Sequence, residues 1–115
     1  MTRLSPRELL LRLTVTHAHL DRLAADHDLH DPDDFRVVYE VVLGLVFAGN
    51  LAREFEQANP EFAGAFPDVI RVRDKLAHLR SYDDISVWRV SSSVDTVLAS
   101  AAERAQALLA RLRPA

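Results

Sequence analysis

The sequence predicts an all-α fold, an antiparallel bundle of about four helices formed by a single domain over residues 1–115. Glycine accounts for only three of the 115 residues, whereas β-rich folds need many tight turns. Hydrophobic residues make up 49% of the chain, enough for a core, and they recur at helical spacing. Prolines and short capping side chains separate these helical stretches, which favours a bundle of helices.

The first helix is expected to begin at Ser5-Pro6. The serine can cap the helix, proline suits its first position, and Glu8 can return the capping hydrogen bond. Apolar residues then recur at helical spacing until residues 27–31 interrupt the pattern. The residues expected on this face are Leu9, Leu10, Leu13, His17, Leu20 and Ala24.

A second helix is predicted over residues 35–57, after a capping aspartate and a proline at Asp31-Pro32. Residues 41–48 are apolar on nearly every side, which predicts that this part of the helix is buried on more than one side. The expected apolar stripe is formed by Phe35, Val38, Val42, Leu45, Val46 and Leu51.

Two further helices are predicted in the second half of the chain. Pro60 and Pro67 predict a loop or a single turn over residues 58–67, followed by a shorter helix over about residues 67–78. A turn and cap at residues 81–84 precede a long last helix. The apolar residues expected along it are Ile85, Trp88, Val94, Leu98, Ala101, Ala105, Leu108 and Leu112.

The composition excludes several classes of function. The chain has no cysteine, which rules out disulfides, thiolate zinc sites, iron–sulfur clusters and cysteine nucleophiles. The longest apolar run, residues 41–48, is too short to span a bilayer and lacks the charge pattern of a signal peptide. We therefore expect a soluble, cytoplasmic protein with no membrane partner. The serines at residues 91–93 have neither a glycine-flanked elbow nor an acid–histidine order, which argues against a hydrolase triad.

Residues 26–34 are strongly acidic, although the net charge of the whole chain is only −3. They contain five aspartates and two histidines but no lysine or arginine, and imidazole with carboxylate can hold a divalent metal. No His-x3-His pair lies on one helix face with a third ligand nearby, and Asp31 and Asp34 already serve the start of a helix. We interpret this stretch as a solvated loop and predict neither a metal nor another cofactor. Metal binding there is the weaker alternative.

Residues 71–80 carry the opposite charge, with four basic residues against one aspartate. Within them, Arg73 is always charged and suits phosphate oxygens, while His78 can exchange protons near neutral pH. Such a pair suffices for RNA cleavage without a metal, since histidine can take the proton of the ribose 2′-hydroxyl and arginine can stabilise the charge on the phosphate. Basic residues near a helix C-terminus also have a structural interpretation, because the helix dipole favours them.

The spacing of this pair matters for the chemistry. Five residues at 3.6 per turn separate the side chains of Arg73 and His78 by about 140° on an ideal helix. They meet only if the helix unwinds near His78 or a second subunit completes the site. Arg71, seven positions before His78, lies on nearly the same face and is the rival partner.

The segment Arg73-Asp74-Lys75-Leu76-Ala77-His78 resembles the signature of the HEPN family, in which an arginine and a polar residue precede a histidine. Residues 66–70 and 82–88 resemble the flanks of this motif in HepT-like toxins, and the long second helix with Gly49 and Ala52 is similar as well. The resemblance covers roughly residues 35–100 and is sharp only over residues 66–88.

The resemblance implies a metal-independent endoribonuclease, a toxin or defence component, that acts on RNA as a symmetric homodimer with its motif helices facing each other. The two Arg–His pairs would then form one composite cleft. It implies that Arg73 stabilises the phosphate, that His78 is the general base or acid, and that Asp74 orients one of them. The residues implied to bind RNA are Arg71, Lys75 and Arg80, as phosphate contacts, and Tyr82, which either stacks on a base or packs on its own core.

The sequence departs from the HepT-like pattern at one position. Those proteins carry a tyrosine two positions after the histidine, where a partner nucleotidyltransferase antitoxin adds AMP. Here that position is Arg80, and the nearest tyrosine is Tyr82. A second HEPN branch, often an accessory module of larger proteins, fits residues 75–78 and 83–89 about as well.

Two other classes of function stay open. The first is an inactive module of the HEPN fold that binds RNA, a nucleotide or a protein partner through the same cleft. The second is a structural dimerisation domain in which the arginines pair with the aspartates of residues 26–34 across an interface.

Overall fold

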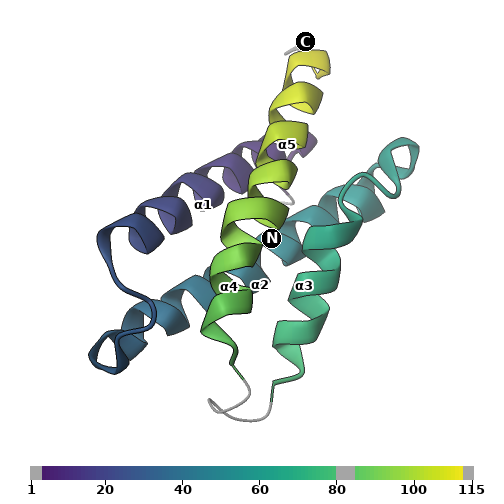
Figure 1. The fold of residues 1–115 in the computed structure, drawn as a ribbon. Helices are drawn as coiled ribbons and strands as arrows, with labels where there is room; N and C mark the ends of the chain where they lie inside the picture. Colours follow the sequence, from purple (N-terminus) through teal and green to yellow (C-terminus); the bar gives the residue numbers. More distant parts are fainter. Residues whose placement is uncertain (1–3, 80–84, 113–115) are drawn as a thin grey trace.

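The computed structural model describes residues 4–79 and 85–112, and this part of the chain contains helices and turns but no strand. These residues form three separate helices and then one continuous helical rod, which can be followed along the chain in Figure 1. The prediction of an all-helical fold with four main helices is confirmed. The separate helices are α1 (Pro6–Asp26), α2 (Phe35–Ala58) and α3 (Pro67–Ala77), and the rod consists of α4 (Val87–Ser92), the π-helical segment η4 (Ser93–Leu98) and α5 (Ala99–Arg111).

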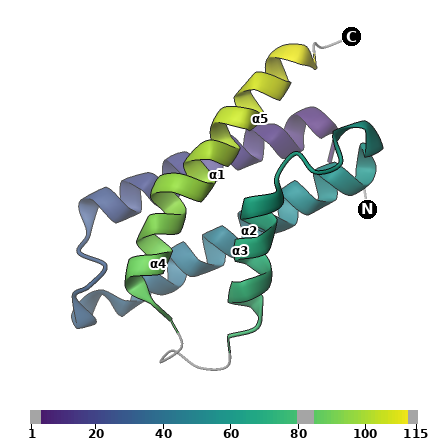
Figure 2. The ribbon, with the colours of Figure 1, turned by 45° about the vertical axis from the view of Figure 1, so that its right-hand side comes forward.

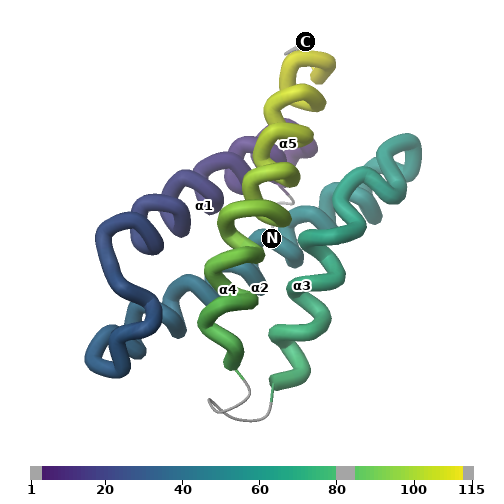
Figure 3. The backbone as a smooth tube through the Cα atoms, viewed as in Figure 1, coloured from purple at the N-terminus to yellow at the C-terminus, as the bar shows by residue number. Residues whose placement is uncertain are grey.

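The helices form two antiparallel pairs that cross each other, as Figures 1 and 2 show. α1 runs beside α2 in the opposite direction, and the rod runs opposite to α3. α2 packs against α1 on one side and α3 on another, while α5 packs on α1. The tube in Figure 3 shows the rod passing across the α1–α2 pair. Buried side chains from every helix join one apolar cluster.

The starts of α1 and α2 follow the predicted local signals. Ser5 accepts a hydrogen bond from the backbone N–H of Glu8 (3.1 Å), and Asp31 accepts one from Asp33 (2.9 Å) at the 3-10 turn η1 (Pro32–Asp34) that leads into α2. The loop before α3 contains the single 3-10 turn η2 (Pro60–Phe62), as predicted. Both carboxylate oxygens of Glu56 accept backbone N–H groups of this loop, which fixes where α3 begins.

The expected apolar stripe of α2 is partly wrong. Phe35 is 50% exposed, and within residues 41–48 the side chains of Leu43 and Phe47 are 69% and 51% exposed. α1 and α3 cover two sides of α2, which confirms the predicted burial on more than one side, and a third side with Leu43 and Phe47 is left open. The buried residues of α2 are Val38, Val41, Leu45, Ala48, Gly49, Leu51, Ala52 and Phe55.

Trp88 was expected on the apolar face of the last helix, and this expectation is wrong. Its side chain is 70% exposed, while Val90, Val94 and Leu98 line the buried face. Val90 lies two positions after Trp88, which places the two side chains about 160° apart around a helix. The tryptophan therefore points away from the core.

One stretch, Pro32–Ala58, is long and apolar enough to cross a membrane when only length and composition are considered. The core helix of a soluble protein meets the same criterion, and α2 contributes eight buried residues to the centre of this bundle. The fold is thus compatible with a soluble protein.

Candidate functional site

The close approach of α3 to α2 positions Arg73. The two helices cross at Gly49, where an added Cβ atom would overlap the Cβ atom of Arg73 and lie 3.0 Å from the carbonyl oxygen of Val69. Only a residue without a side chain allows the helices to come this near. The crossing lays the stem of Arg73 directly on α2.

The guanidinium of Arg73 is held from two sides. Its Nε donates to Oδ1 of Asn50 at 2.8 Å, and its Nη1 donates to Oδ1 of Asp74 at 2.8 Å. The Arg73 side chain is 27% exposed, so it is partly shielded from water yet still reachable. An arginine has five N–H donors, and in the described part of the chain three of them are left for a ligand. The arrangement can bind an anionic group such as a phosphate.

His78 lies at the end of α3, just beyond the last helical residue, Ala77. Its backbone N–H bonds to the carbonyl of Lys75 at 3.3 Å, and its side chain is exposed. Among residues 4–79 and 85–112, no hydrogen bond or ion pair joins the imidazole to Arg73 or to any other side chain. The helix therefore ends next to His78, where it would have to unwind for Arg73 and His78 to meet. Even so, no hydrogen bond or ion pair joins these two residues in the described part of the chain.

The other predicted site residues are divided between the faces of α3. Arg71 forms an exposed ion pair with Asp68 (3.7 Å), and Lys75 lines a groove beside α4. Both positions lie about 160° around the helix from Arg73. Arg80 and Tyr82 lie outside the described residues.

The sequence interpretation missed Asn50, although this residue holds Arg73. Asn50 stands directly after Gly49 in an otherwise apolar stretch of α2, and that contrast is the signal that could have drawn attention to it. It also missed the groove that Lys75 shares with Trp88 and Arg89.

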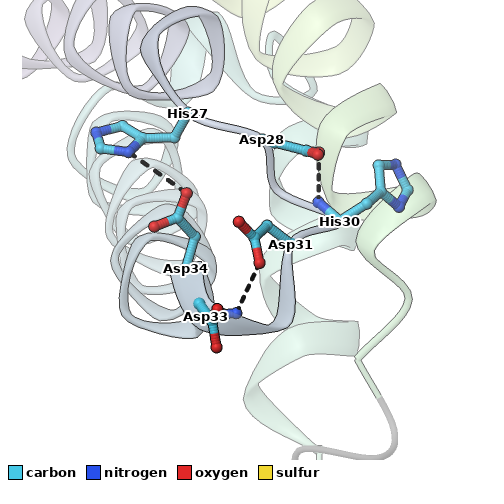
Figure 4. A network of polar contacts seen from close by, with 6 residues as sticks. All are labelled: His27, Asp28, His30, Asp31, Asp33 and Asp34. Atoms are coloured by element: carbon cyan, nitrogen blue, oxygen red, sulfur yellow. Dashed lines mark hydrogen bonds and ion pairs between the residues drawn. The ribbon is translucent and has the colours of Figure 1, made fainter.

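The side chains of the acidic stretch before α2 bind groups within the same stretch (Figure 4). Asp28 accepts the N–H of His30 at 3.0 Å, while the ring of His27 pairs with Asp34 at 3.7 Å. The two imidazoles lie on opposite sides of the loop (Figure 4). Within residues 4–79 and 85–112, no group of three histidine or acidic side chains is arranged to hold a metal ion.

No family model, curated protein or solved structure matches this chain. The resemblance to HEPN proteins therefore stays a prediction that depends on the motif and its flanks.

Proposed function

We propose that this protein is a cytoplasmic, metal-independent endoribonuclease that works as a homodimer, a HEPN-like toxin or defence effector. The observation that carries the proposal is the held guanidinium of Arg73, with hydrogen bonds of 2.8 Å to both Asn50 and Asp74. A cation fixed in place before the substrate arrives stabilises developing negative charge without reorganising first. The exposed imidazole of His78 at the end of the same helix supplies the proton-transfer group.

A second copy of the chain supplies what one copy lacks. Asn50, which holds Arg73, follows Leu43 and Phe47 at helical spacing, so all three lie on the open side of α2. A second copy docked on this side buries the two exposed apolar side chains. It also brings a second motif helix beside Arg73, so that the arginine of one copy can act with the histidine of the other.

The reaction needs no group beyond these residues and the RNA. His78 takes the proton of a ribose 2′-hydroxyl, and the 2′-oxygen attacks the adjacent phosphorus. Arg73 stabilises the extra negative charge on the phosphate oxygens while the bond from phosphorus to the 5′-oxygen breaks. The protonated imidazole of His78 then gives its proton to the leaving 5′-oxygen. The products are a 2′,3′-cyclic phosphate and a 5′-hydroxyl.

One observation favours a second candidate function, a module that binds RNA, a nucleotide or a protein partner without cutting. In the described part of the chain, no hydrogen bond or ion pair joins His78 to Arg73, whereas Arg73 has donors left for a phosphate. On this alternative the cleft binds its ligand and no proton is transferred. A nucleotidyltransferase antitoxin is the partner proposed for the toxin version.

The test is RNA cleavage by the purified protein in excess EDTA, beside His78→Ala, Arg73→Ala and the matched control Arg12→Ala on the exposed side of α1. Circular dichroism checks that all four proteins fold. We expect cleavage by the parent and the control only, with 2′,3′-cyclic phosphate ends. Full cleavage by folded His78→Ala would overturn the proposal. RNA binding by the parent without any cleavage would favour the binding module.

A further inference from the structure

A groove lies between the C-terminal end of α3 and the start of α4, and the residues that line it include Lys75 but not Arg73. It has a volume of about 390 Å³. Val72, Leu76 and Ile85 form its apolar floor, and all three are partly buried against the core. Lys75, Trp88 and Arg89 lie around it with exposed side chains.

The described residues that line this groove carry positive charge in a protein whose net charge is −3. Among residues 4–79 and 85–112, its lining contains Lys75 and Arg89 but no carboxylate, whereas three other hollows formed by these residues each include at least one. Neither cation forms an ion pair with a carboxylate of residues 4–79 or 85–112. Residues 71–89 together contain five lysines or arginines against three aspartates, so the surplus persists when the whole segment is counted. An anionic ligand is therefore favoured.

The aromatic side chain beside these cations is unusually open. The indole of Trp88 is 70% exposed, the largest fraction among the exposed large hydrophobic side chains of the described residues. An open aromatic face next to basic residues is the combination with which proteins bind nucleobases, since every base has a flat face that stacks on an aromatic ring while its phosphate meets a cation.

We propose that this groove binds a nucleotide, with the base stacked on Trp88 and the phosphate held by Lys75 and Arg89. The nucleotide is either free in solution or one unit of an RNA strand, since both present the same chemistry. This site goes beyond the proposed cleavage, because Lys75 and Arg73 lie about 160° apart around α3. Binding in the groove requires no proton transfer, so the two proposals can fail separately.

The experiment uses the single tryptophan of the chain as its probe. The intact protein is titrated with AMP and, separately, with a 2′-O-methyl oligoadenylate, which lacks the hydroxyl needed for cleavage. Quenching of Trp88 fluorescence reports the stacking. Fluorescence anisotropy of a labelled oligoadenylate then compares Trp88→Ala and the double variant Lys75→Gln/Arg89→Gln with the control Arg12→Ala.

We expect saturable quenching that weakens as salt rises, because phosphate contacts release counterions. Trp88→Ala should weaken binding roughly tenfold, the effect of losing one base–aromatic stack. Quenching by AMP identifies a free nucleotide as sufficient, and quenching by the oligonucleotide alone identifies an RNA strand. Absence of quenching by both ligands at low salt would overturn the proposal, as would unchanged binding by the folded double variant. Since the oligonucleotide cannot be cut, neither result depends on cleavage.

Discussion

Replacing Gly49 by alanine should destabilise the protein, although alanine is the better helix former. The added Cβ atom would overlap Cβ of Arg73, lie 2.7 Å from its Cγ and 3.0 Å from the carbonyl oxygen of Val69. Neither a Cβ atom nor a backbone carbonyl can rotate away, so α3 must move. Overpacking costs about 1–3 kcal/mol, and a contact this rigid belongs at the upper end. Alanine regains about 1 kcal/mol of helix propensity.

The net loss is therefore about 2 kcal/mol, which lowers Tm by roughly 8 °C for a domain of this size. Thermal and urea unfolding followed by circular dichroism measure it. Gly44 provides the matched control on the same helix, because an added Cβ there meets the terminal methyl groups of Leu20 at 2.6 and 2.8 Å. A flexible side-chain end can shift, so Gly44→Ala should stay within about 1 kcal/mol of the parent. Equal stability of Gly49→Ala and the parent would refute the argument that the helix crossing depends on this glycine.

Three further substitutions test separate parts of the molecule. Asn50→Ala removes one of the two acceptors of the motif arginine, so we expect RNA cleavage to fall about three- to tenfold with little change in Tm; unchanged cleavage would contradict the positioning role. Leu43→Glu with Phe47→Glu should leave folding intact, because both side chains are more than half exposed, but convert dimer to monomer in light scattering; a persistent dimer would place the interface elsewhere. Asp31→Ala should cost about 1 kcal/mol through the lost cap of the turn before α2, measured by urea unfolding. An equal loss in Asp33→Ala, which keeps that cap, would argue against this cause.

Local signals in the sequence were sufficient to predict the helices and the starts of α1, α2 and α3. The last helix instead begins at Val87 with Ser86 as its cap, and the cap predicted at residues 81–84 lies outside the described residues. Ser5-Pro6 and Asp31-Pro32 each satisfy backbone N–H groups within three residues, so the interaction can be recognised without knowing the fold. The orientation of long helices around their axes is a different problem. Phe35 and Trp88 both fit an apolar pattern, but their exposure depends on which sides of a helix its neighbours cover.

In the candidate site, too, contacts between neighbours in the sequence could be predicted, whereas contacts that depend on helix packing could not. Asp74 follows Arg73 directly in the sequence, so a contact between the two could be anticipated, and a hydrogen bond joins them. Asn50 lies 23 positions away, and only the crossing at Gly49 brings it to the guanidinium. The spacing argument also anticipated that Arg73 and His78 would meet poorly within one chain. Within the described residues, no hydrogen bond or ion pair links them.

This separation yields a decisive experiment on the composite cleft. If the arginine of one subunit acts with the histidine of the other, a mixed dimer of Arg73→Ala and His78→Ala keeps one such pair across the subunits, whereas the parent dimer has two. Random mixing gives half mixed dimers, so activity should return to about a quarter of the parent value, while each variant alone stays inactive. If the two groups act within one chain, every subunit lacks one of them and the mixture stays inactive.

Differently tagged subunits, purified in sequence after co-expression, establish that mixed dimers form. Inactive mixed dimers, in a protein whose parent cleaves RNA, would refute pairing between subunits and require His78 to reach Arg73 within its own chain. Recovered activity would explain why a single chain can hold its arginine so firmly against Asn50 and Asp74 while its histidine points to solvent. The guanidinium must be fixed before the dimer closes, because the rest of the cleft comes from another molecule, whereas the histidine needs its exposed position to reach across.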